Sequence, residues 1–187
     1  MHTAIIIHGR PDEEEYFDDK FDSPSNSFWI PWIQHKLLIN KIFAQTPEMP
    51  TPYNPNYNEW KKEFERFDIN ENTILVGHSR GGGFIIRWLS ENNIKVDKVA
   101  LVAPSLISEV GSDFYNFNLD KNMLSKANNF KIFYSRDDEE EITLSVENLI
   151  KEIPEIESHI KYFDNMGHFD SDMGTREFPE LLEFLIS

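Results

Sequence analysis

Short apolar runs alternate along the chain with amphipathic segments. The runs are rich in β-branched residues and apolar at consecutive positions, which is typical of strands buried on both faces of a parallel sheet. Between them, apolar residues recur at helical spacing, as Trp60, Phe64 and Phe67 do among charged residues. The pattern therefore predicts an α/β fold, with a mostly parallel sheet of about six strands and helices on both of its faces.

The expected elements follow from where each run begins and ends. Strands are expected at 3–7, 42–44, 73–76, 96–103, 130–134 and 156–163. Helices are expected at 28–42, 57–67, 82–90, 119–127, 142–153 and 177–186. The acidic, turn-rich segment 10–27 is expected to be a long loop. Since no internal repeat or linker interrupts the alternation, residues 1–187 are predicted to form a single domain.

One turn in this pattern has a form that is associated with catalysis. The third apolar run breaks at the sequence GHSRG, residues 77–81, where Ser79 stands between two glycines just before a predicted helix. This G-x-S-x-G form is typical of a tight strand-to-helix turn that lifts a serine hydroxyl off a sheet. The alternative is a glycine-rich turn that binds phosphate or only connects the two elements. A P-loop is excluded, because the Lys-Ser/Thr pair that closes one is missing.

Polar residues follow four of the predicted strands. His8 and Gly9 follow the first strand and Ser79 the third, while the Asp137-Asp138 pair and His168 follow the fifth and sixth. In open α/β sheets, ligands bind just beyond the carboxyl ends of the strands. We therefore expect all four polar sites to lie at one edge of the sheet.

A serine hydroxyl needs a general base, and a histidine base needs a carboxylate that orients it. His168 is the histidine that lies in a loop just past the final strand, and it follows Ser79 in the chain order that this fold requires. An ordinary loop histidine is the alternative reading.

The orienting carboxylate is less sharply defined by the sequence. Asp138 is preferred to Asp137 because the acid in this turn typically stands a few residues beyond the strand. If both aspartates belong only to a solvated acidic run, Asp164 or Asp170 is the alternative acid.

The negatively charged oxygen of a reaction intermediate needs two N–H donors. The backbone N–H groups of Arg80, which follows the serine, and of Arg10, in the loop after the first strand, are expected to supply them. The side chains of Arg80 and Arg136 flank the serine and the acid, where they either accept an anionic group of the substrate or pair with local carboxylates. Pairing with carboxylates is the favoured interpretation.

Composition excludes several classes of protein. The net charge of -15 disfavours nucleic acids and anionic membrane surfaces as partners, and no apolar run is long enough to span a membrane. The absence of cysteine excludes disulfides and thiolate chemistry. The acidic runs 12–15 and 137–141 lack the ligand spacing of a calcium loop, so neither a metal nor a cofactor is expected. The N-terminus lacks the features of a signal peptide, and a cytoplasmic location is expected.

The sequence resembles the small serine hydrolases that include retinoblastoma-binding protein 9 and bacterial YdeN. The resemblance runs from about Ile5 to the C-terminus. The residues that carry it are His8-Gly9, Trp29, Trp32, Pro47-Glu48-Met49-Pro50, Trp60, the 77–82 turn, Asp137-Asp138 and Gly167-His168-Phe169. The sequence departs from the family in two places. It has Glu139 where members often have proline, and its loop after the first strand is acidic and poor in glycine.

The resemblance implies an α/β-hydrolase fold of three layers without a large cap domain. It also implies a nucleophile, acid and base at Ser79, Asp138 and His168, and serine-hydrolase activity on poorly defined substrates. The leading hypothesis is an esterase-type hydrolase that cleaves a small ester-like substrate through an acyl-Ser79 intermediate. The alternative is a protein-binding module that kept the hydrolase scaffold while its activity lapsed. Exposed Trp or Phe side chains around Phe114, Tyr115 and Phe117 would favour that alternative, as would a triad too splayed to hydrogen-bond. The sequence itself indicates no protein partner.

Overall fold

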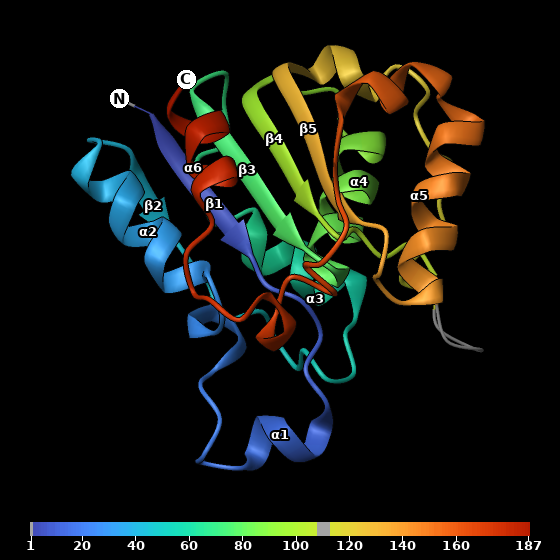
Figure 1. The fold of residues 1–187 in the computed structure, drawn as a ribbon. Coiled ribbons are helices and arrows are strands. Elements are labelled where there is room, and N and C mark those ends of the chain that lie inside the picture. The colour runs from blue at the N-terminus through green and yellow to red at the C-terminus, as the bar shows by residue number, and fades with distance from the viewer. Residues whose placement is uncertain (1, 108–112) are drawn as a thin grey trace.

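The computed structural model describes residues 2–107 and 113–187, and its six strands form one parallel sheet (Figure 1). The strand order is β2-β1-β3-β4-β5-β6, and every neighbouring pair is parallel. The strands are β1 (Thr3–Ile7), β2 (Phe43–Gln45), β3 (Thr73–His78), β4 (Val96–Val102), β5 (Ala127–Ser135) and β6 (Ile160–Phe163). The predicted α/β class and parallel sheet are confirmed.

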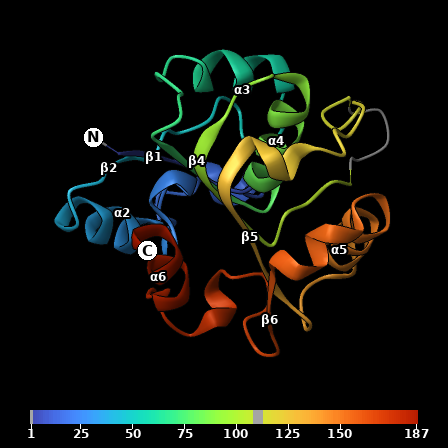
Figure 2. The ribbon, with the colours of Figure 1, turned by 90° about the horizontal axis from the view of Figure 1, so that it is seen from above.

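Helices cover both faces of the sheet and complete a three-layer arrangement. Figure 2 shows α2 and α6 on one face, with α3, α4 and α5 on the other. The α-helices are α1 (Glu13–Phe17), α2 (Ile30–Ile39), α3 (Tyr57–Phe64), α4 (Arg80–Glu91), α5 (Glu140–Glu152) and α6 (Pro179–Ile186). The short 3-10 helices are η1 (Pro24–Asn26), η2 (Met123–Lys126), η3 (Pro154–His159) and η4 (Ser171–Met173).

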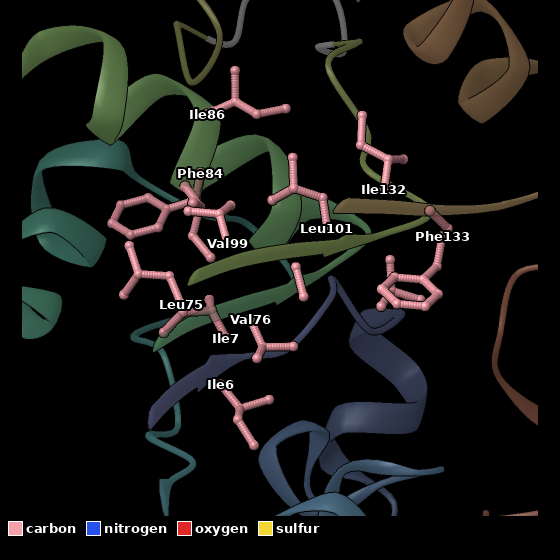
Figure 3. Packing of buried hydrophobic residues seen from close by; sticks show 14 of the residues in the cluster. Ile6, Ile7, Leu75, Val76, Phe84, Ile86, Val99, Leu101, Ile132 and Phe133 are labelled. Atoms are coloured by element: carbon pink, nitrogen blue, oxygen red, sulfur yellow. The ribbon is translucent and has the colours of Figure 1, made fainter. Parts of the chain in front are cut away.

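The core lies on both faces of the central strands, as their continuous apolar sequences require. Ile6 and Val76 are paired neighbours that point to one face, while Phe84 and Ile86 pack from α4 on the other (Figure 3). Burying one such aliphatic or aromatic side chain stabilises the fold by about 1.5–3 kcal/mol. The resulting sheet is a rigid platform whose carboxyl edge carries the loops described below.

Three sequence predictions differ from the structure. The segment 10–27 contains α1 and η1, because acidic residues favour the first turn of α1 and Pro24 stands at the start of η1. The predicted helix at 119–127 is wrong, since only η2 forms there and β5 already begins at Ala127. The predicted strand at 156–163 begins too early, because Pro154 starts the 3-10 helix η3 and leaves only Ile160–Phe163 extended.

In the described part of the chain, no helix combines the length and the apolar character that crossing a membrane requires. The short helix α1 lies beyond the carboxyl ends of the strands, on the side of the sheet edge that carries the loops (Figure 1).

Candidate active site

Ser79 occupies a strained turn between β3 and α4. Its backbone has φ 51° and ψ -117°, a region that residues with a side chain rarely adopt. The turn is held by hydrogen bonds from the Ser79 N–H to the Val102 carbonyl at 2.9 Å and from the Ser105 N–H to the Ser79 carbonyl at 3.0 Å. Gly81 allows α4 to begin here, since a Cβ on it would lie 2.3 Å from the Ile7 carbonyl oxygen. These restraints place Ser79 at the carboxyl edge of the sheet.

His168 and Asp138 come together from the loops that follow β6 and β5. His168 Nδ1 lies 2.9 Å from Asp138 Oδ1. The Asp138 side chain is 0% exposed and the His168 side chain 18%. Because an ionised carboxylate can only accept, Nδ1 carries the donated proton and Nε2 keeps its lone pair. The imidazole therefore has the tautomer of a general base.

Opposing effects act on the pKa of His168. Burial lowers the pKa, whereas the hydrogen bond to Asp138, the charge of Asp138 and the charge of Asp170 raise it. The raising effects win, so the pKa of His168 lies above its ordinary value of 6.5.

Asp137 has a different place in the same turn. Its Oδ1 accepts a short hydrogen bond from the Ser135 hydroxyl and a second from the Gly167 N–H at 3.2 Å. The Ser135 hydroxyl in turn accepts from the Met166 N–H at 3.0 Å. The hydrogen bond from Ser135 lowers the pKa of Asp137, desolvation opposes it, and bonds from backbone N–H groups lower the pKa further. Asp137 therefore ties the acid turn to the loop that carries His168, while Asp138 contacts the imidazole.

Ser79 and His168 line one cavity of about 870 Å³. This volume is in the range of sites for small molecules. The Ser79 hydroxyl makes no hydrogen bond to a described residue. Hydrogen bonds between a catalytic nucleophile and its base are often long without substrate and shorten when substrate binds. Over residues 2–107 and 113–187, no group of three or more His, Asp and Glu side chains could hold a metal ion.

The loop after β1 passes directly beside Ser79. A Cβ on Gly9 would lie 3.6 Å from Ser79 Oγ. Buried His8 fixes this loop, because its Nε2 accepts from the Met49 N–H at 3.0 Å while its Nδ1 donates to the Gly9 carbonyl at 2.6 Å. Burial lowers the pKa of His8 and keeps it neutral in this role.

The two expected oxyanion donors both belong to cavity-lining residues. Arg80 is the first residue of α4, where backbone N–H groups have no partner within the helix. The Arg10 N–H shares a trans peptide with the Gly9 carbonyl, so it points away from the group that His8 holds. The Arg10 side chain donates to the Tyr53 carbonyl at 3.0 Å, which anchors the loop.

Two donors that sequence reasoning missed hold the backbone of the His168 loop. His78 Nε2 donates to the His168 carbonyl at 2.7 Å, and Trp29 Nε1 donates to the Phe169 carbonyl at 3.0 Å. Burial lowers the pKa of His78 to about 3, with a smaller contribution from His168, so the ring stays neutral. These contacts join residues 90 and 140 positions apart, and no motif in the sequence signals them.

Replacing His78 with phenylalanine is expected to keep the bulk of the ring but to release the His168 carbonyl. A misplacement of about 1 Å in a catalytic group can cost about 10²-fold in rate, so we expect a loss of this order in kcat/KM. Ester hydrolysis by purified His78→Phe and by His35→Phe, which changes an exposed histidine on α2, measures the effect. Equal activity of the two variants would show that His78 does not position the base.

Two arginines and three aromatic residues that the sequence singles out have different surroundings in the structure. Arg136 is exposed and pairs with Asp164 at 2.7 Å, as the pairing interpretation expects. Arg80 is 6% exposed and lines the cavity. Phe114 is buried, and Tyr115 is half-buried against the core. Phe117 is half-buried there as well, so these three side chains form no exposed aromatic surface for a partner.

The sequence profile of the serine hydrolase family matches residues 21–187. The chain belongs to this family. YdeN of Bacillus subtilis (strain 168) is 23% identical over 194 residues, which cover 98% of this chain and 94% of YdeN. The resemblance noted from the motifs is thereby confirmed.

Solved structures give this serine hydrolase the α/β-hydrolase fold. The crystal structure of the ydeN gene product from B. subtilis superposes with a TM-score of 0.79 at 23% identity, covering 99% of this chain and 97% of that one. The methylesterase MES16 from Arabidopsis has a TM-score of 0.61 at 11% identity, with coverage of 100% and 98%. The fluorophosphonate-binding serine hydrolase FphF of Staphylococcus aureus has a TM-score of 0.59 at 14% identity, with coverage of 100% and 84%.

Proposed function

We propose that this serine hydrolase cleaves small carboxylic esters through an acyl-enzyme, with Ser79 as nucleophile, His168 as general base and Asp138 as its orienting acid. The observation that carries the proposal is the 2.9 Å contact between His168 and the buried Asp138, at a cavity that Ser79 also lines. Membership of the family supports hydrolysis, and a methylesterase among the similar folds is in keeping with ester chemistry.

In the first half of the reaction, His168 Nε2 takes the proton of the Ser79 hydroxyl while Oγ attacks the ester carbonyl carbon. The carbonyl oxygen becomes an oxyanion, and Asp138 stabilises the imidazolium. The protonated imidazole then gives its proton to the departing alkoxide, which leaves as an alcohol. Water repeats the sequence on the acyl-serine: its proton goes to His168 and its hydroxyl to the acyl carbon, and the proton returns to Ser79 Oγ as the carboxylic acid departs.

The backbone N–H groups of Arg80 and Arg10 are proposed to bind the oxyanion. The partial positive charge at the start of α4 adds to the field at this point. A single oxyanion donor typically contributes about 10²–10³-fold to kcat. The strained backbone of Ser79 and the pinned Gly9 carbonyl support this role, since both fix the local backbone before substrate arrives.

The activity of the enzyme is expected to decline on the acid side with an inflection above pH 6.5, because only neutral His168 can act as base and its pKa is raised. Replacing Asp138 with asparagine removes the charge that raises the pKa, so the inflection should move to lower pH. Measuring kcat/KM against pH for both proteins checks the shift. A rate that stays constant well below pH 6.5 in the wild-type protein would contradict the role of His168.

Release of p-nitrophenol from p-nitrophenyl esters tests the proposal, with an early burst reporting the acyl-enzyme. Ser79→Ala should abolish both burst and turnover. Ser105→Ala is the matched control, because Ser105 lines the same cavity but its hydroxyl donates to Glu141 at 2.5 Å. It should retain most of the activity. Turnover that persists in Ser79→Ala, or that is absent from the folded wild-type protein with every ester tried, would overturn the proposal.

A further inference from the structure

The side chain of Arg80 lies beside the nucleophile and is not used by the proposed mechanism, which needs only its backbone. It is 6% exposed and lines the same cavity as Ser79 and His168. Its guanidinium carbon lies 5.7 Å from the ring centre of Phe114 and 5.5 Å from that of Tyr115. These contacts hold the cation in one place by packing and cation–π attraction.

No carboxylate among residues 2–107 and 113–187 forms an ion pair with Arg80, and no acceptor in this part of the chain receives a hydrogen bond from its side chain. A guanidinium has five N–H donors, and a buried charge is normally paired because leaving it unpaired is costly. The comparison with Arg136 is direct, since that cation is exposed and already paired with Asp164. The side chain of Arg80 therefore offers the cavity a positioned, unpaired cation.

We propose that the Arg80 guanidinium binds a carboxylate on the substrate, so that the enzyme prefers esters that carry a negative charge. This inference rests on the proposed function and adds the class of substrate. Guanidinium pairs with carboxylate through two parallel hydrogen bonds, which gives both energy and orientation. The start of the twelve-residue helix α4 contributes partial positive charge at the same place.

The remaining charges of the cavity make the preference a sharp one to test. The cations Arg10, Lys20 and Arg176 also line it, but six carboxylates outnumber them, and this excess would favour a cationic substrate; the carboxylates are Asp12, Glu15, Asp22, Glu139, Glu141 and Asp170. Some are engaged locally: Asp22 pairs with Arg176 at 2.9 Å, and Glu141 accepts from the Ser105 hydroxyl. Recognition by Arg80 thus predicts that anionic esters are the better substrates, whereas attraction by the acidic lining predicts that cationic esters are.

Esters of matched length distinguish these orders. The kcat/KM values of p-nitrophenyl hydrogen adipate, p-nitrophenyl hexanoate and p-nitrophenyl 6-aminohexanoate are compared after subtracting spontaneous hydrolysis. The adipate ester should be the best substrate, and 4-(hexanoyloxy)benzoate shows whether a carboxylate on the leaving group serves as well. In Arg80→Met the ratio of adipate to hexanoate should fall about 10- to 100-fold. The same ratio for Arg80→Lys should lie between those of the wild type and Arg80→Met, because a lysine keeps the charge but cannot form two parallel hydrogen bonds to a carboxylate.

Arg136→Met is the control, since it removes an exposed cation of the acid turn and should leave the ratio unchanged. A preference for the cationic ester, or an equal ratio in wild type and Arg80→Met, overturns the inference while the proposed function stands. Calorimetric binding to folded Ser79→Ala protein does not depend on turnover. Monomethyl adipate should bind that protein more tightly than methyl hexanoate, and adding Arg80→Met should remove the difference. Equal binding of the two esters overturns the inference even if no ester is hydrolysed.

Discussion

Replacing Asp138 with asparagine is expected to lower kcat/KM for ester hydrolysis by about 10⁴-fold, the size of effect seen when a triad aspartate is made neutral. The amide keeps the shape of the side chain but can donate to His168 Nδ1, which favours the wrong tautomer of the imidazole. It also removes the charge that stabilises the imidazolium. Because the Asp138 side chain is completely buried, water cannot take over either role.

Asp137→Asn is the matched comparison, one residue away in the same turn. It weakens the acceptor for the Ser135 hydroxyl and the Gly167 N–H, so we expect a small loss of stability and a much smaller loss of activity than in Asp138→Asn. Steady-state kinetics and urea denaturation of both variants separate the two roles. Equal losses of activity, or a larger one in Asp137→Asn, would mean that the acid is misassigned.

Gly81→Ala is expected to destabilise the protein by at least about 3 kcal/mol, or to prevent folding. The added Cβ would meet the Ile7 carbonyl oxygen at 2.3 Å and the His8 carbonyl oxygen at 2.5 Å. Both obstacles are backbone atoms of β1 and the residue that follows it, which cannot turn aside as a flexible side chain can. The helix α4 would have to move away from β1, and Ser79 would move with it.

Gly174→Ala provides the control for this substitution. Gly174 has φ 64°, but a Cβ there would meet no atom within 4 Å. Its cost should therefore be only the backbone strain, about 1–2 kcal/mol. Urea unfolding of the wild type and of both variants measures the two losses of stability. If the Gly81→Ala protein is at least as stable as the Gly174→Ala protein, the close packing of α4 on β1 is contradicted.

Much of the fold could be predicted because its central strands are apolar on both faces and each ends at a polar or glycine-containing turn. Ser79, Asp138 and His168 could be chosen because each follows a different strand, and parallel strands end at one edge. What could not be predicted depends on contacts between distant segments. His78 and Trp29, for example, donate hydrogen bonds to the loop that carries His168, and no spacing in the sequence relates either residue to that loop.

Charges gave the clearest limit to sequence reasoning. Arg80 directly follows Ser79 in the sequence, and Arg136 stands two positions before Asp138, so each lies close to a predicted catalytic residue. Only the folded chain distinguishes them, because the loop after β6 brings Asp164 to Arg136, while Phe114 and Tyr115 enclose Arg80. Likewise, the acidic residues of segment 10–27 favour the first turn of α1 but do not by themselves predict the helix, since a helix of five residues owes its stability to its surroundings.

Covalent labelling by a neutral alkyl fluorophosphonate tests most directly whether Ser79 is an activated nucleophile. A fluorophosphonate reacts with a serine hydroxyl that a neighbouring base activates, so the adduct reports on nucleophilicity rather than on the fold. Intact-protein mass spectrometry should show one adduct on the wild-type protein and on Ser105→Ala, located by peptide mapping at Ser79. The adduct should be absent from Ser79→Ala and form much more slowly on Asp138→Asn. Folded wild-type protein that gains no adduct, or an adduct that persists in Ser79→Ala, would contradict a Ser79-His168-Asp138 active site.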